Sequence, residues 1–185
     1  MMYFSKGEAR RNRKGCLTVT HMGRSVRLEK ESAEIWGKGR FRFCIARRQE
    51  EIQAVAYMAN VGIAELETDE TESAKYRMLQ RCIITVRKKG TGIFLPPRER
   101  RILRWLRYSG FRIGIAELVA LEEKHILPDK RLLSDKNWKV LAEKIYGAKP
   151  LSNNKLERQM EHSKSRNDTV AALMHLVKLC RVRLN

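Results

Sequence analysis

The chain has 185 residues, 43% of them hydrophobic and 32% charged, which is a globular composition and enough length for one ordinary domain or two small ones. Its 39 lysines and arginines outnumber 21 aspartates and glutamates, giving a net charge of +18 that favours a polyanionic partner: nucleic acid first, an anionic membrane surface second, an acidic protein third. No apolar run is long enough for a membrane span or a signal peptide, so we expect a cytoplasmic protein with no membrane contact.

The basic excess is uneven along the chain. Residues 1–15 carry five bases and one acid, and residues 16–95 carry fourteen bases and ten acids. Residues 96–185 carry twenty bases and ten acids, which is more than half of the imbalance. We therefore predict three regions with these boundaries: a flexible basic arm, a first domain, and a basic second domain. For the arm, the alternative is a frayed terminus that only adds solubility.

Strands and helices alternate in the first half. Alternating apolar and polar residues at 17–19, followed by a turn near Gly23, predict a short strand or hairpin edge. Helical spacing predicts a helix over 28–39, and aromatic alternation predicts a strand over 41–46. The segment 47–66 has the clearest amphipathic helical pattern of this half, and the glycine at position 62 would end that helix.

The end of the first half combines an acidic connector, an apolar run and a basic turn. An acidic connector over 65–73 is followed by an apolar run at 82–86, which predicts a buried strand, and by the basic turn RKKGTG. Helix, loop and a β segment with a basic tip is the order of that family, so the resemblance implies a winged-helix-like domain with Lys88 and Lys89 at the tip. The carboxylates of the connector would repel phosphates. An ordinary solvated turn is the alternative for the tip.

The second half is predicted to be a series of helices ending in a short strand. We expect helices over 96–110, 113–127, 134–147 and 167–180, with a polar, partly helical segment over 149–166. The sequences RILRWLRYSG, IAELVALEEK and SDKNWKVLAEKIYG resemble, in order, the helices of helix-turn-helix DNA-binding proteins. The connector HILPDKRLL is longer than the tight turn of that motif. The sequence thus predicts an α+β, mostly helical protein with a winged-helix-like first half and a helix-turn-helix-like second half.

Arginines are densest in the helix predicted over 96–110. Two helical flanks carry them: Arg100, Arg104 and Arg107 on the first, and Arg101, Trp105, Tyr108 and Arg112 on the second. Guanidinium groups beside aromatic rings suit a sugar–phosphate surface, because arginine binds phosphate in a bidentate manner and a ring can lie against a sugar or base. The alternative is a solvated helix whose Trp105 and Tyr108 fill the core.

The helix predicted over 134–147 offers a second group of polar contacts. Asn137 near its start is of the type that reads an adenine edge, with lysines on the phosphates; the alternative is an ordinary exposed face. The complete set of predicted nucleic-acid-binding residues is Arg98, Arg100, Arg101, Arg104, Arg107, Arg112, Lys136, Asn137, Lys139, Lys88 and Lys89.

Sequence motifs give no indication of catalysis. The chain has no Walker loop, GxSxG, HExxH or GxGxxG motif, and its four isolated cysteines and four histidines do not recur at metal-ligand spacing. We therefore expect no enzyme, no cofactor, no metal and no disulfide. The leading hypothesis is a double-stranded-DNA-binding transcriptional regulator or mobile-element accessory protein, with RNA binding and a homodimer left open. The alternative is a protein–protein adaptor whose basic helical half docks an acidic partner.

Overall fold

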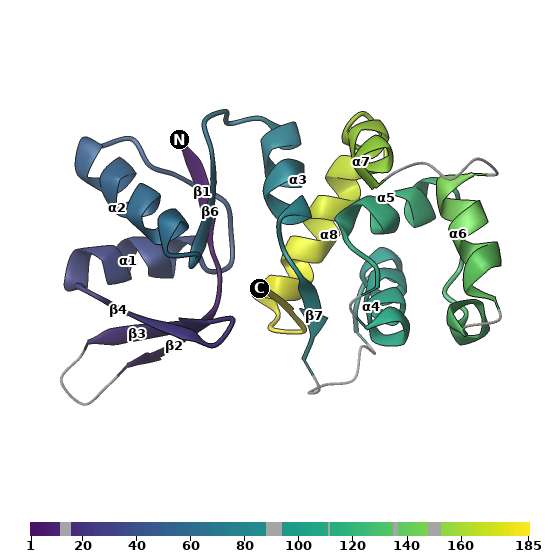
Figure 1. Cartoon of the computed structure of the whole chain (residues 1–185), viewed down its shortest axis with the longest axis horizontal. Helices are drawn as coiled ribbons and strands as arrows, with labels where there is room; N and C mark the ends of the chain where they lie inside the picture. Colours follow the sequence, from purple (N-terminus) through teal and green to yellow (C-terminus); the bar gives the residue numbers. More distant parts are fainter. Residues whose placement is uncertain (12–15, 88–93, 111, 135–136, 148–152) are drawn as a thin grey trace. The chain divides into compact units, whose positions relative to one another are not determined.

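The chain folds into two compact units (Figure 1). The computed structural model describes residues 1–11, 16–87, 94–110, 112–134, 137–147 and 153–185. Unit 1 comprises residues 1–81 and 184–185, and unit 2 comprises residues 82–183. Eight α-helices and small antiparallel sheets in the described residues confirm the predicted α+β, mostly helical class. The division into units falls after Arg81, whereas the sequence analysis placed a boundary after residue 95.

Unit 1 contains two three-stranded sheets and three helices. Its elements are β1 Met2–Ser5, β2 Glu8–Arg11, β3 Leu17–His21, β4 Arg24–Leu28, α1 Lys30–Gly39, β5 Cys44–Ile45, α2 Gln49–Asn60, β6 Ala64–Glu67 and α3 Glu72–Gln80. The sheets have the strand orders β5-β1-β6 and β2-β3-β4, and every pair is antiparallel. Met22 and Gly23 both have positive φ, 48° and 79°, as a two-residue hairpin turn between β3 and β4 requires.

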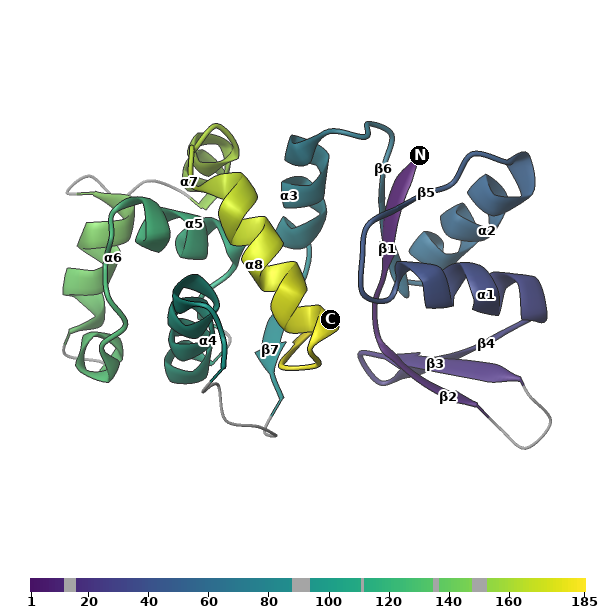
Figure 2. The same ribbon diagram turned by 180° about the vertical axis from the view of Figure 1, so that it is seen from behind.

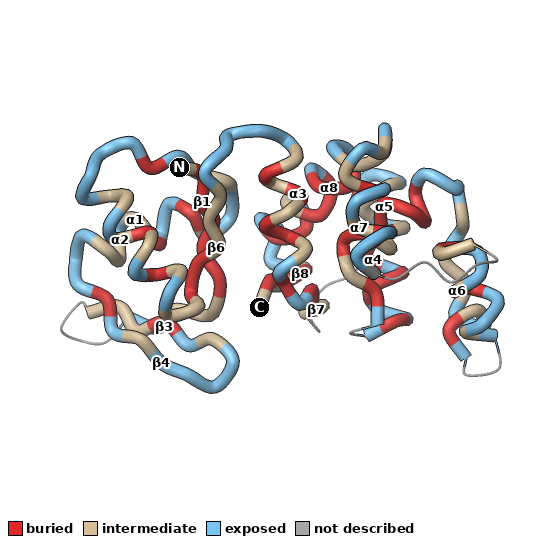
Figure 3. Tube along the Cα trace, turned by 45° about the horizontal axis from the view of Figure 1, so that its top comes forward, coloured by how far each residue is buried: buried red, intermediate tan, exposed pale blue. Residues whose placement is uncertain are grey.

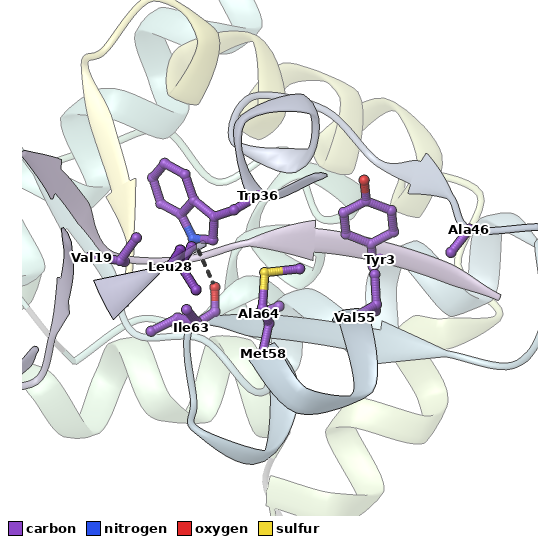
Figure 4. Close-up of a cluster of buried hydrophobic side chains, with 9 residues drawn as sticks. All are labelled: Tyr3, Val19, Leu28, Trp36, Ala46, Val55, Met58, Ile63 and Ala64. Carbon is purple, nitrogen blue, oxygen red and sulfur yellow. Dashed lines mark hydrogen bonds between the residues drawn. The ribbon is translucent and has the colours of Figure 1, made fainter. Parts of the chain in front are cut away.

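The core of unit 1 forms around Trp36 of α1 (Figure 4). The register of β3 and β4 sends Val19 and Leu28 to the same inward face, where they pack with residues of α2 and β6. The buried indole Nε1 of Trp36 lies 3.2 Å from two carbonyl oxygens, those of Lys6 and Ile63. The polar atom of the largest core side chain is therefore satisfied, and it joins α1 to the ends of β1 and β6.

The predicted flexible arm over 1–15 is wrong for the part that the structure describes. Met2, Tyr3 and Phe4 are buried, and β1 is the central strand of its sheet, with β5 on one side and β6 on the other (Figure 2). The short apolar run at the start of the chain is therefore folded despite the basic residues that follow it. Its two partner strands complete the backbone hydrogen bonds of β1. Residues 12–15 lie outside the described residues.

Two further predictions for the first half are corrected. The strand predicted over 41–46 is reduced to the two residues of β5; Phe41 and Ile45 are exposed, and Phe43 is partly buried. Helix α3 was not predicted: it begins at Glu72, within the acidic connector, and precedes strand β7 Ile84–Val86, which lies in the apolar run predicted to be a strand. The side chain of Thr71 caps α3 by accepting a hydrogen bond from the backbone N–H of Ala74. This additional helix departs from the element order on which the winged-helix resemblance rests.

Unit 2 contains the four helices predicted for the second half and a fifth, α7, within the segment predicted to be partly helical. Its elements are β7 Ile84–Val86, α4 Pro97–Ser109, α5 Ile115–Glu123, a 3₁₀ turn η1 Lys130–Leu133, α6 Trp138–Tyr146, α7 Asn153–Glu161 and α8 Arg166–Lys178. Strand β8 Val182–Leu184, which pairs with β7, belongs to unit 2 up to Arg183. Helix α5 is buried on most of its surface and contacts α6, α7 and α8 (Figure 3). Of the helices that the structure describes, none is long and apolar enough to cross a membrane.

Candidate nucleic-acid interface

One face of α4 fixes this helix in unit 2. Pro97 stands at its start, where the missing N–H of proline has no helical partner to lose, and Gly110 follows its end with a φ of +62°. Ile102, Leu103 and Leu106 are buried, and α4 contacts α8 and β7. The packing of this apolar face therefore fixes the position of the helix.

That opposite side carries a row of arginines. Arg100, Arg104 and Arg107 recur at i, i+4 and i+7, and all three are exposed, as is Tyr108 beside them. Among the described residues, neither Arg100 nor Arg104 has a carboxylate partner. We call these four residues the α4 stripe. It presents three guanidinium groups to solvent from one rigid helix.

The second predicted flank is different. Trp105 is completely buried, so the prediction that it lies against a sugar or base is wrong, and the alternative, that it fills the core, is confirmed. Burying this large ring beside Ile102, one turn earlier, removes more apolar area from water than an exposed position would. Only Tyr108 remains as an exposed aromatic residue of α4.

Arg98 and Arg101 bind carboxylates of their own unit. Arg101 makes a bidentate contact with Glu122 of α5, from Nε to Oε1 at 2.9 Å and from Nη2 to Oε2 at 2.6 Å. Arg98 lies 3.4 Å from the same carboxylate through Nε and 2.7 Å from Asp168 of α8 through Nη1. The side chain of Glu122 is only 4% exposed, so it needs these cations. The hydrogen bonds to Glu122 raise the pKa of Arg101. Both arginines join helices and leave little charge for a ligand.

The loop after α4 meets the start of α6. The guanidinium carbon of Arg112 lies 5.9 Å from the centre of the Trp138 ring, a cation–π contact, and Lys139 next to Trp138 is exposed. Asn137 is exposed, but its Nδ2 donates a hydrogen bond of 2.9 Å to the backbone oxygen of Arg131. In this conformation the amide closes the turn before α6, so this donor is already used within the protein.

Three predicted contact residues cannot be placed, and two basic residues were missed. Lys88, Lys89 and Lys136 lie outside the described residues. Lys130 and Arg131 of η1 are exposed, and η1 contacts both α4 and α6. The sequence does show two adjacent basic residues after Pro128 and Asp129, but this segment was predicted to be a loop, so their place relative to the helices could not be inferred. Asp129 holds Arg131 at 3.0 Å, which reduces the charge that Arg131 offers.

Comparison with known protein families, with curated proteins and with solved structures finds no match for this chain. Within the described residues, no group of three or more histidines, cysteines, aspartates and glutamates is placed to hold a metal ion. The interpretation of the α4 stripe therefore depends on its exposure, spacing and charge.

Proposed function

We propose that the protein binds double-stranded DNA through the α4 stripe. The observation that supports this is the row of Arg100, Arg104 and Arg107 on the exposed side of a helix whose other side is buried. The unit that carries the row has 23 bases and ten acids between residues 82 and 183, against sixteen bases and eleven acids in unit 1. A concentrated positive surface of this kind attracts a polyanion and accelerates association with it.

The binding would be to phosphates. From Arg100 to Arg107 the helix rises about 10 Å, at roughly 1.5 Å per residue, while duplex DNA carries one phosphate charge per about 1.7 Å of its axis. Three long arginine side chains can therefore reach different phosphates at once. Such contacts position a protein on the duplex and carry no sequence information. Lys139 and Arg112, at the start of α6 and before α5, would extend the same surface.

The roles beyond phosphate binding stay predictions. A transcriptional regulator or a mobile-element accessory protein would also need to read bases. The helix-turn-helix-like order of α4, α5 and α6 is the element series from which such reading would come. The winged-helix-like description of the first half likewise stays a prediction.

A salt series tests the proposal. The affinity of the full chain is measured for duplex DNA, single strands and structured RNA between about 50 and 200 mM salt, where a protein with several phosphate contacts loses orders of magnitude in affinity. Tight, strongly salt-dependent binding to arbitrary duplex DNA is expected. Preference for structured RNA would replace DNA as the ligand. Indifference to every nucleic acid, together with binding to an acidic protein, would favour the adaptor alternative.

A further inference from the structure

Unit 1 carries a second basic surface between α1 and α2. Residues 38–48, KGRFRFCIARR, contain five bases and no acid, and we call them the basic edge because they include β5, an outer strand of the sheet β5-β1-β6. Arg42, Arg47 and Arg48 are exposed. Hydrogen bonds hold the segment in place: the backbone N–H of Ala46 donates to the backbone oxygen of Met1 at 2.8 Å, and β1 pairs with β5.

Carboxylates of unit 1 do not neutralise the basic edge. In the described part of the chain, no ion pair joins Arg40, Arg42, Arg47 or Arg48 to an acid. The nearby carboxylate of Glu51 accepts hydrogen bonds from the backbone N–H groups of Arg47 at 3.1 Å and Arg48 at 3.4 Å. These bonds lower the pKa of Glu51, so its carboxylate stays charged and caps the start of α2. It is one negative charge beside the five positive charges of the basic edge.

The basic edge also presents an aromatic ring to solvent. The side chain of Phe41 is 37% exposed, and the guanidinium carbon of Arg40 lies 4.9 Å from the centre of that ring and 5.6 Å from the centre of the Trp36 ring. The ring of Phe43, by contrast, packs edge to face on the ring of buried Phe4, with 5.6 Å between the ring centroids. Arg40 therefore anchors Phe41 against the buried core while part of the ring stays accessible.

We propose that the basic edge binds single-stranded nucleic acid, with Phe41 stacking on an unpaired base and the exposed arginines contacting the neighbouring phosphates. A positive track with an accessible ring is the arrangement by which proteins hold single strands without reading sequence. In a duplex the faces of the bases are covered by their neighbours, so a ring at this site gains nothing from double-stranded DNA. This function is additional to the duplex binding proposed for α4 and does not depend on it.

The experiment compares three probes with the full chain. Fluorescence anisotropy measures binding to an oligothymidylate and an oligouridylate of about 20 nucleotides each, which exceed one typical site, and to a duplex of the same length. The Phe41→Ala variant is expected to bind both single strands roughly five- to 150-fold more weakly, as loss of one stacked base implies, with unchanged duplex affinity. A loss for only one of the two strands would identify that strand, DNA or RNA, as the ligand.

Two further variants separate stacking from folding. Phe41→Leu keeps an apolar side chain over the core but has no ring, so it should reproduce the loss with an unchanged melting temperature. Arg42→Gln/Arg47→Gln should weaken single-strand binding and reduce its salt dependence. Tyr57→Ala, which removes an exposed ring on α2, and Arg24→Gln on β4 are the matched controls and should bind like the parent.

The proposal is overturned if the parent chain binds neither single strand, if Phe41→Leu binds them like the parent, or if the Phe41 variants weaken duplex binding to the same extent. Failure of the duplex proposal has a different signature. It leaves the duplex affinity of an Arg100→Gln/Arg104→Gln/Arg107→Gln variant unchanged, whatever the single-strand probes show.

Discussion

Helix α3 in unit 1 and helix α4 in unit 2 both carry arginines, but their neighbours differ. At the end of α3, Arg81 contacts Glu65 at 2.6 Å and Glu67 at 2.7 Å, both on strand β6. Arg77 contacts Glu67 at 3.0 Å and Asp69 at 2.6 Å. The arginines of α3 thus hold the helix against an acidic strand, and the connector that was expected to repel phosphates is largely neutralised by its own unit.

On α4, some arginines bind carboxylates and others do not. Arg98 and Arg101 bind the buried Glu122, whereas Arg100 and Arg104 have no carboxylate partner among the described residues. The difference shows that a count of basic residues overstates the charge available to a ligand. An arginine beside a carboxylate of its own unit stabilises the fold. An arginine without such a neighbour can bind a ligand.

The largest expected effect concerns the buried side of α4. Leu106→Ala removes a fully buried side chain and should lower the free energy of unfolding by about 2–5 kcal/mol, because it leaves a cavity between α4 and its neighbours. Urea denaturation measures this. A loss below about 0.5 kcal/mol would mean that α4 is not anchored by this face, and the distinction between its two sides would fail.

A matched pair of substitutions then compares the two kinds of arginine. Arg101→Gln leaves the buried carboxylate of Glu122 with only Arg98 and should cost about 1–3 kcal/mol of stability. Arg104→Gln, one turn along the same helix, should change stability by less than about 0.5 kcal/mol and weaken DNA binding. Equal stability losses in the two variants would show that Arg104 has a structural partner too.

A smaller effect is expected from pH, and it concerns α3. Burial favours a higher pKa for Glu67, but the hydrogen bonds from Arg81 and Arg77 outweigh it, so the pKa lies below its ordinary value of 4.5. A carboxylate of this kind binds fewer protons when folded, so its contribution is complete above the ordinary pKa and is lost as the pH falls below it. Unfolding measured from about pH 7 to about pH 3 should therefore show falling stability. Glu67→Gln should make the decline less steep, and an unchanged slope would contradict the role of this ion pair.

Local patterns made much of the fold predictable. The helices of unit 2 were identifiable because their apolar residues recur at helical spacing between prolines, capping residues and glycines. Strand β1 was not, since four residues are too few for a periodic signal and its partners β5 and β6 are distant in the chain. Helix α3 was missed because its composition is largely polar and its packing against β6 is a tertiary contact.

The candidate site was predictable where it depends on spacing along one helix, and not where it depends on contacts between distant residues. The spacing of Arg100, Arg104 and Arg107 indicated one exposed flank, and their exposure follows directly from helix geometry. The pairing of Arg101 with Glu122 spans 21 residues, and no local pattern reports such a pairing. The burial of Trp105 was within reach of the sequence, because this residue follows Ile102 by one helical turn and so shares its apolar face.

The central claim is that the arginines of the α4 stripe bind phosphates, and that Arg100 and Arg104 do so without supporting the fold. Its most direct test is the slope of log affinity against log salt for duplex DNA, measured for the parent chain and for Arg100→Gln/Arg104→Gln. We predict an unchanged melting temperature, weaker binding to all duplex sequences alike, and a slope flatter by up to about 0.9 for each phosphate that the variant no longer neutralises. An unchanged affinity and slope in the double variant would contradict the claim and leave these arginines as a solvated helix face.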